Sequence, residues 1–427
     1  MKWLLQKIIL GIVISSLLLG QSCKKDDITP MSGADSTKAV NTYIYEIVKE
    51  WYLWYDKLPS NTPDVYLSPQ AFLDSLTYKP IDRWSFVITK KEYDDYFVQG
   101  TMYGHGFSFS LDAENRFRIA YLFKNSDLYK AGVHRSWIIE KINGVTPDTG
   151  NIFDLLGPSE AGITNIFLFK KPDGSEVTDT FTKKEVTMNM VLYRDTLHVD
   201  NKIVGYLVFE GFLADAEAEL NEAFDYFNKA GISELVLDLR YNGGGELSIA
   251  EYLAGIIGGN AANNMPFVTL TYNDKHQKNN TTTKIIKNSK TVILNRLFVI
   301  TTKETASASE ALINGLKPYM DVYLIGSQTY GKPTGMNVYS IQSYNYILAP
   351  VTFKLTNKNN YGDYFDGLPV DKQAIDDIYH DFGNRNEACL SQALYYIQNG
   401  TFTASVKAYY VPYKHPKQGW RTEVIAY

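Results

Sequence analysis

Short apolar runs alternate with amphipathic segments through the second half of the chain. The apolar runs are rich in β-branched and aromatic residues and predict buried strands at 203–209, 235–239, 297–301 and 321–325. The segments beside them place apolar residues at helical spacing and predict helices at 214–229, 247–257, 387–399 and from about Ser307 onward. Such alternation is typical of an α/β fold with a largely parallel sheet. The sequence therefore predicts an α/β domain over residues 188–400.

Two smaller regions are expected before this domain. Residues 37–98 carry an apolar and aromatic stripe at helical spacing from Val40 to Trp54, followed by a second helical segment at Pro69–Leu76. We interpret the stripe as a packing surface and the region as an N-terminal helical domain. Residues 99–187 are expected to form a small β domain. Residues 401–427 form a C-terminal extension in which no chemistry is evident.

The first residues have the pattern of an export signal. Lys2 and Lys7 precede an apolar run at 8–20 that is short for a membrane span and typical of a signal peptide, which is expected to end at Ser22. Residues 23–36 are mostly polar and are expected to be a flexible tether.

Composition narrows the classes of function. A net charge of −5 gives no reason to expect a nucleic-acid partner. Of the two cysteines, Cys389 lies in an apolar segment and is expected to be buried, and the six histidines lack ligand spacing. We therefore expect no disulfide framework and no metal site built from cysteines or histidines.

Ser307 and Lys332 stand in settings that suit a nucleophile and its base. Ser307 follows a predicted strand and begins a predicted helix, where free backbone N–H groups and the helix dipole would stabilise negative charge on a bound carbonyl. Lys332 follows the next strand in the tight turn GSQTYGKPTG. A lysine acts as a base near neutral pH only if burial or a cation lowers its pKa. A helix-capping serine and a solvated turn lysine remain the alternative for each residue alone.

Three consecutive glycines form a second feature. Gly243, Gly244 and Gly245 end a predicted strand and precede a predicted helix, so their backbone N–H groups could approach a ligand without Cβ interference. A phosphate-binding loop is weakly indicated, because no Gly-Lys-Ser/Thr follows. An oxyanion donor beside a serine nucleophile fits the residues better.

The motifs LDLRYNGGG, TASASE and TYGK together resemble the C-terminal processing, or tail-specific, serine proteases with a Ser–Lys dyad. The resemblance implies that Ser307 is the nucleophile and Lys332 the general base, with oxyanion donors at Ala308 and Gly244. It also implies the fold shared by Clp proteases and crotonases. Two positions depart from the pattern. Met336 stands where many members have a glutamine that orients the lysine, and Pro333 stands where glycine is usual, so another group must orient Lys332 or activity is reduced.

A second resemblance concerns residues 99–187. Gly104, His105, Gly106 and Phe107 resemble the Gly-Leu-Gly-Phe loop of PDZ domains, whose N–H groups hold the terminal carboxylate of a peptide that pairs with a sheet edge. The order of the residues that follow is also similar, although Ser136 and Trp137 replace the usual Gly-Asp. The resemblance implies peptide binding by this loop. A β domain that serves only as a spacer is the alternative.

The leader resembles that of a bacterial lipoprotein. Leu19 to Ser22 are loosely similar to a lipobox, which implies lipidation of Cys23, and the charged residues after Cys23 resemble the surface-export signal of some Bacteroidetes lipoproteins. The expected location is the cell envelope, as an outer-membrane lipoprotein anchored by its lipid on the periplasmic face or the cell surface. An ordinary secreted protein is the alternative.

These resemblances imply a cell-envelope serine endopeptidase that recognises unstructured C-terminal tails of protein or peptide substrates and needs no cofactor. A non-catalytic peptide- or ligand-binding lipoprotein on the same fold is the alternative, and Met336 is its best argument.

Overall fold

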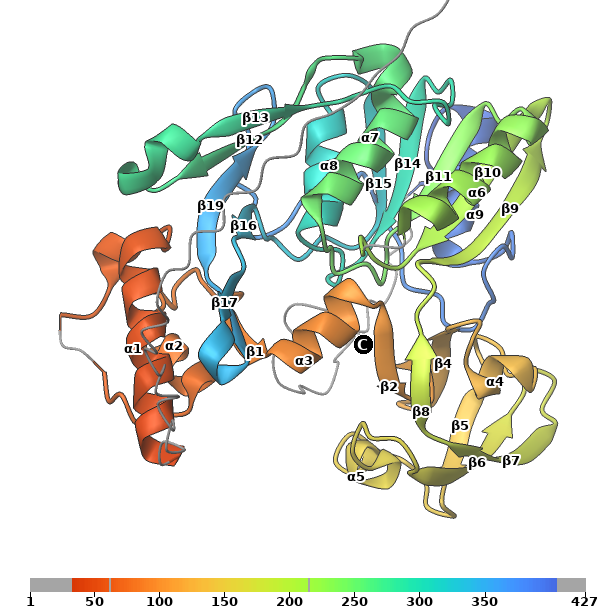
Figure 1. Ribbon diagram of the computed structural model, residues 1–427. Helices are drawn as coiled ribbons and strands as arrows, with labels where there is room; N and C mark the ends of the chain where they lie inside the picture. The colour runs from red at the N-terminus through yellow and green to blue at the C-terminus, as the bar shows by residue number, and fades with distance from the viewer. Residues whose placement is uncertain (1–32, 61–62, 214–215, 405–427) are drawn as a thin grey trace, which may run out of the picture.

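The computed structural model describes residues 33–60, 63–213 and 216–404, and its centre is a six-stranded sheet (Figure 1). The strand order is β20-β15-β14-β11-β10-β9, with β10 to β20 parallel and β9 antiparallel at one edge. The strands are β9 (Val191–Val199), β10 (Lys202–Phe209), β11 (Glu234–Asp238), β14 (Arg296–Thr301), β15 (Asp321–Gly326) and β20 (Lys372–Gln373). The four predicted strands are confirmed, and the α/β prediction with them.

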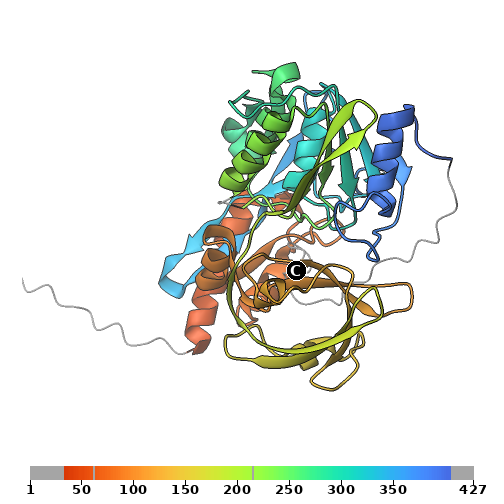
Figure 2. The same ribbon diagram turned by 90° about the vertical axis from the view of Figure 1, so that its right-hand side faces the viewer.

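Helices cover both faces of this sheet. Side chains that alternate along each strand belong to two separate cores, as the two-residue period of a strand requires. One core contains α6 (Ala216–Ala230), α7 (Leu247–Ala262) and α8 (Ala308–Leu316), and the other contains α9 (Ala388–Asn399). Figure 2 shows the blue helix α9 on the opposite side of the sheet from the green helices. Because the central strands are parallel, the loops after β10, β11, β14 and β15 meet at one edge.

Two smaller β-sheets connect this core to the N-terminal region. One sheet has the order β13-β12-β19-β16, and another has the order β1-β18-β17. These strands are β1 (Phe86–Thr89), β12 (Pro266–Tyr272), β13 (Thr281–Lys284), β16 (Thr334–Met336), β17 (Tyr339–Ile341), β18 (Tyr346–Ala349) and β19 (Val351–Thr356). The 3₁₀ turn η3 (Asp274–Asn279) caps the β12–β13 hairpin and packs against α1 (Gly33–Trp51).

The N-terminal region at 37–98 contains the predicted helical segments and packs closely on strands from the second half of the chain. The helices α1 and α2 (Pro69–Leu76) share one core with Ile341, Leu348 and Val351. Strand β1 pairs with β18, which comes from far along the chain. The tether predicted at 23–36 extends too far, because α1 begins at Gly33. The negative charge of Asp35 in the first turn interacts favourably with the helix dipole.

Residues 101–187 form an antiparallel β unit. Its five-stranded sheet has the order β3-β4-β5-β6-β7, which leaves β3 at an edge, and β2 pairs with β8 beside it. The elements are β2 (Thr101–Gly104), β3 (Phe107–Leu111), β4 (Phe117–Leu122), α4 (Asp127–Lys130), β5 (Ile138–Ile142), α5 (Ile152–Leu156), β6 (Thr164–Lys170), β7 (Glu176–Thr182) and β8 (Lys184–Thr187).

A short connector joins the N-terminal region to the β unit. It consists of α3 (Lys90–Tyr93) and the π-helical turn η2 (Asp94–Val98), and Figure 1 shows it below the loop edge of the central sheet. In the part of the chain that the structure describes, no helix combines the length and apolar character needed to span a membrane. The predicted leader, Cys23 and residues 405–427 lie outside the described residues.

Candidate active site

Ser307 occupies a strained turn between β14 and α8. Its φ of +56° and ψ of −113° lie in a region that non-glycine residues rarely adopt. The turn makes Ser307 the residue that precedes the first helical residue, so its side chain stands beside the free N–H groups of the first helical turn. Such strain persists only where the surrounding structure fixes it, and it is often found at functional sites.

The glycine loop packs directly against Ser307. A Cβ atom on Gly244, whose φ is +105°, would lie 2.7 Å from the Cβ of Ser307 and 3.0 Å from the backbone nitrogen of Ala308. Only glycine therefore permits this close approach. The N–H of Ala308 finds no acceptor among the described residues and faces the same space, which suits its predicted role as an oxyanion donor.

The predicted oxyanion role of Gly244 does not fit this conformation. Its N–H donates to Oδ1 of Asn242 at 2.9 Å and is therefore already occupied. The N–H groups of Gly243 and Gly245, which line the same cavity, have no acceptor in the described part of the chain. The spacing of a glycine triplet cannot reveal which of its N–H groups a neighbouring amide side chain occupies.

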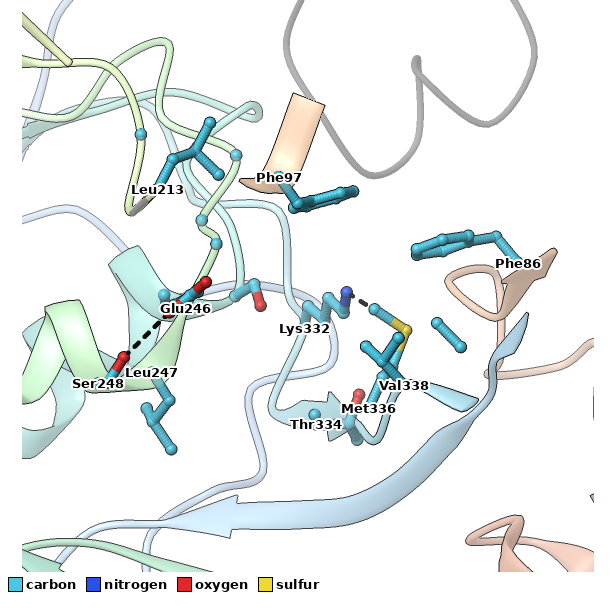
Figure 3. Close-up of a pocket in the computed structure, with 18 of the residues that line it drawn as sticks. Phe86, Phe97, Leu213, Glu246, Leu247, Ser248, Lys332, Thr334, Met336 and Val338 are labelled. Atoms are coloured by element: carbon cyan, nitrogen blue, oxygen red, sulfur yellow. Dashed lines mark hydrogen bonds between the residues drawn. The ribbon is translucent and has the colours of Figure 1, made fainter. Parts of the chain in front are cut away.

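Lys332 is buried beside this turn. Only 4% of its surface is exposed, and this desolvation lowers the pKa of its amine to about 8, although the negative charges of Asp82 and Glu310 oppose the shift. The Nζ atom lies 4.0 Å from Sδ of Met336 (Figure 3). A thioether is a weak acceptor and carries no charge, so it contacts the amine without favouring its protonated form. Met336 thus contacts the amine of Lys332 from a position four residues after it in the chain.

Glu310 joins the segments that carry the serine and the lysine. Its buried carboxylate accepts hydrogen bonds from the N–H of Ser307 (3.0 Å), the N–H of Lys332 (2.8 Å), the N–H of Gly331 (2.7 Å) and the hydroxyl of Thr329 (2.5 Å). Burial raises the pKa of Glu310, and these four donors oppose that shift. Glu310 therefore orients the segment of Lys332 through its backbone N–H groups and not through the amine. Sequence reasoning missed this role, although the Ser-x-x-Glu spacing of a capping box could have indicated it.

Ser307 and Lys332 line one cavity of about 340 Å³. Most of its other walls are apolar, and Figure 3 shows Phe86 and Phe97 facing Lys332 and Met336. Tyr93 also lines this cavity and stacks on Phe97 with 4.9 Å between ring centroids. In this conformation no hydrogen bond joins the hydroxyl of Ser307 to the amine of Lys332, and such contacts often tighten only when substrate binds.

The N-terminal region also holds the Lys332 segment. Arg83 donates from Nη2 to the carbonyl of Tyr330 at 3.1 Å, and its guanidinium lies 4.7 Å from the centre of the Tyr330 ring. The N–H of Tyr330 in turn donates to the carbonyl of Thr305 at 2.9 Å, next to the serine turn. The N-terminal region is thus part of the site, which its aromatic stripe did not predict.

A buried ionic network supports the glycine loop from behind. Arg240 is fully buried and pairs with Asp238 (2.7 Å), Asp376 (2.8 Å) and Glu387 (2.9 Å). Arg135 of the β unit pairs with Asp376 at 3.0 Å. Although burial opposes it, the two guanidinium groups lower the pKa of Asp376 to about 2. The network therefore joins the β unit to the strand that leads into the loop.

A second cavity, of about 130 Å³, lies in the β unit. Gly104, His105, Gly106 and Phe107 all line it, so the structure brings these four predicted residues together around one hollow. Phe109 on the edge strand β3 and Phe153 on α5 add apolar walls, and their ring centroids are 6.2 Å apart. The cavity therefore combines an apolar lining with an edge strand.

Two of these residues also have structural roles. His105 is buried, its Nε2 lies 2.7 Å from Oδ1 of Asn165, and burial lowers its pKa to about 4, so the ring is neutral at physiological pH. A Cβ on Gly106, whose φ is +72°, would lie 2.7 Å from the Cβ of Ser126 inside the domain. Gly106 is thus required for internal packing as well as for any binding by the loop.

No group of three or more His, Cys, Asp or Glu side chains is arranged to hold a metal ion within 33–60, 63–213 and 216–404. Cys389 is buried in the core of α9, as expected, and its thiol lies 3.2 Å from the carbonyl of Ile375. The lipidation predicted at Cys23 concerns a residue outside the described part.

Fold and site together define an α/β protein in which a strained serine and a buried lysine line one cleft. Residues 203–368 match the family model described as Peptidase family S41, and residues 39–86 match the one described as Peptidase S41 N-terminal domain. The chain therefore belongs to peptidase family S41. These matches include Ser307, Lys332, Glu310 and the glycine loop.

Similarities to individual proteins are consistent with this family. The chain is 27% identical over 271 residues to a protein of Staphylococcus saprophyticus named as a CtpA-like serine protease, and 25% identical over 330 residues to one of Staphylococcus epidermidis with the same name. The alignments cover 61% and 75% of this chain, and the chain spans only 52% and 61% of the length of these relatives. A solved structure from Bacteroides fragilis, assigned to the S41 proteases, is 26% identical with a TM-score of 0.70, and the match covers 84% of this chain and 97% of that one.

Proposed function

We propose that this protein is a serine endopeptidase in which Ser307 is the nucleophile and Lys332 the general base. The observation that carries the proposal is the buried amine of Lys332, with a pKa of about 8, in the same cavity as a serine at the N-terminus of α8. An amine with this pKa is partly neutral at physiological pH and can accept a proton. Membership in peptidase family S41 supports this choice of reaction.

The proposed reaction has two halves. Ser307 Oγ attacks the scissile carbonyl while Lys332 Nζ accepts its proton, and the N–H of Ala308 stabilises the resulting oxyanion together with an N–H of the glycine loop. Lys332 then returns the proton to the departing amine, which leaves an acyl group on Ser307. Water activated by Lys332 releases that acyl group and restores the serine. No step requires a cofactor.

We further propose that the β unit is a PDZ-like domain that recognises unstructured C-terminal tails, and that the α/β core is a variant of the Clp protease and crotonase fold. The edge strand β3, the apolar cavity beside it and the glycine-containing loop at 104–107 support tail binding. A tail would pair with β3 and place its carboxylate at the loop. Amidation of the tail should then lower the cleavage rate of an otherwise identical substrate.

The proposed location rests on the sequence alone. Export by residues 1–22 and lipidation at Cys23 would place the enzyme in the cell envelope as an outer-membrane lipoprotein. Cell fractionation tests this proposal, because a Cys23→Ala variant should move from the membrane fraction to the soluble fraction of the envelope. If wild type and variant fractionate alike, the lipid anchor is wrong.

The activity is tested with protein that lacks residues 1–23. The wild type should degrade an unfolded protein such as casein, and Ser307→Ala should abolish this activity. Lys332→Arg is the matched control, because it keeps a positive charge but cannot supply a base. Unchanged proteolysis in Ser307→Ala, or substantial proteolysis in Lys332→Arg, would refute the dyad.

A non-catalytic binding protein is the second candidate. Two observations favour it, namely the occupied N–H of Gly244 and the weak contact between Lys332 and Met336. A fluorophosphonate probe separates the two functions: labelling at Ser307 supports the enzyme. Tail binding with neither labelling nor cleavage would support the binding protein.

A further inference from the structure

Glu210 is a buried carboxyl group that the proposed reaction does not use. Glu210 directly follows the last residue of β10, and only 4% of its surface is exposed. Its backbone N–H donates to the carbonyl of Met190 at 2.8 Å. Oε1 accepts a hydrogen bond from the hydroxyl of Tyr121 at 3.3 Å. Oε2 is buried and has no partner among the described residues. A carboxyl oxygen left without a partner is costly, which calls for an explanation.

The position of Glu210 between two cavities offers an explanation for this unpartnered oxygen. Glu210 and Tyr96 are the two residues that line both the cavity of Ser307 and the cavity of the PDZ-like unit. The two cavities therefore adjoin at this pair. A polypeptide held in the second cavity while it is cut at Ser307 would have to pass the unpartnered oxygen.

We propose that Glu210 binds the main chain of the substrate segment that connects a tail held in the PDZ-like cavity to the scissile bond at Ser307. This inference rests on the proposed function and adds a binding site for an extended peptide segment to it. A protonated carboxyl group offers one donor and one acceptor, which matches the C=O and N–H groups of a peptide. The site reads no side chain, so it would accept many sequences.

The protonation state of Glu210 agrees with this role. Burial raises its pKa to about 8, the hydrogen bond from Tyr121 opposes the shift, and the charge of Glu219 adds to it. The groups that face it are Tyr121 from β4, Glu219 from α6 and Tyr96 from η2, and Lys332 lines the same cavity. At neutral pH the group is mainly protonated, so it can donate to a substrate carbonyl.

Two substrates and two variants test the inference. The long substrate is an unfolded protein with an apolar C-terminal tail, and the short one is a blocked fluorogenic peptide that spans the scissile bond at Ser307 but ends before it reaches Glu210. Glu210→Leu removes both the donor and the acceptor, while Glu210→Gln keeps both and stays neutral. At pH 7, Glu210→Leu should lower kcat/KM for the long substrate by about tenfold or more, because both hydrogen bonds to the substrate main chain are lost. Glu210→Gln should stay near wild type, and all three proteins should cut the short peptide alike.

The pH dependence gives a second readout. The ratio of kcat/KM for the long substrate to that for the short one should fall in wild type as pH rises through about 8, because Glu210 loses its donor. In Glu210→Gln the ratio should stay constant. Glu219 and Lys332 remain in both proteins, so their titration cancels in this comparison. The same profile decides the question if Glu210→Leu fails to fold.

Each outcome has one meaning. A pH-independent ratio in wild type, or a Glu210→Leu variant that cuts both substrates at wild-type rates, would overturn the role of Glu210 while leaving the peptidase intact. A wild type that cuts neither substrate would overturn the proposed function, and this inference with it.

Discussion

Glu310 offers the sharpest test of how the site is held together. Its carboxylate accepts bonds from the N–H groups of both Ser307 and Lys332 on Oε2, and from Thr329 and Gly331 on Oε1. A Glu310→Gln variant has nearly the same shape but carries an NH₂ group in place of one oxygen. If the remaining oxygen keeps Thr329 and Gly331, the new NH₂ group faces two N–H donors.

The expected loss follows from these contacts. Hydrogen bonds to a charged group are worth about 1.5–3 kcal/mol each, so losing two costs about 3–6 kcal/mol, divided between folding stability and placement of the proposed nucleophile and base. If half of this appears in catalysis, kcat falls about 10- to 150-fold, since about 1.4 kcal/mol corresponds to a factor of ten. The melting temperature should also fall, because a domain's total stability is only about 5–15 kcal/mol.

The assay measures kcat on a short peptide well below the melting transition, together with the rate of fluorophosphonate labelling and the melting temperature. Glu234→Gln is the matched control, because it also neutralises a buried glutamate, which pairs with Arg296 at 2.6 Å at the start of β11, away from Ser307. The control should lose stability but keep kcat. Wild-type kcat and melting temperature in Glu310→Gln would refute the idea that this carboxylate joins the two segments.

Three further predictions concern single residues. On a short peptide, kcat/KM should rise about tenfold per pH unit below the Lys332 pKa of about 8 and level off above it, because only the neutral amine accepts a proton; a flat profile from pH 6 to 9 would exclude Lys332 as the base. Gly244→Ala should abolish labelling of Ser307, since the new Cβ would lie 2.7 Å from the serine Cβ, and labelling at the wild-type rate would contradict this packing. Phe153→Asp should place a charge in the cavity of the β unit and, if tails bind there as proposed, lower cleavage of tailed substrates without slowing a short peptide; equal rates on tailed substrates would show that tails bind elsewhere.

Local patterns determined most of the core. The strands β10, β11, β14 and β15 agree with the predicted runs to within about one residue, because a buried strand between two helical layers must be apolar along its whole length. The helix α2 agrees fully with its predicted bounds. Local patterns did not show how the N-terminal region packs on the rest of the chain. Strand β1 finds its partner in β18, and a pairing across that separation leaves no local trace in the sequence.

For the candidate site, too, some features follow from the sequence and others only from the tertiary structure. The sequence by itself singled out Ser307 and Lys332 as candidates, because their motifs combine short-range features: a strand, a turn, a helix start and a glycine-rich turn. Only the tertiary structure decided the environment of Lys332, the occupied N–H of Gly244 and the placement of Glu210 between two cavities. Burial, hydrogen-bond partners and shared cavities depend on residues brought together from distant parts of the chain. A motif can therefore name candidate reacting groups, while packing sets their pKa, their orientation and the cavities beside them.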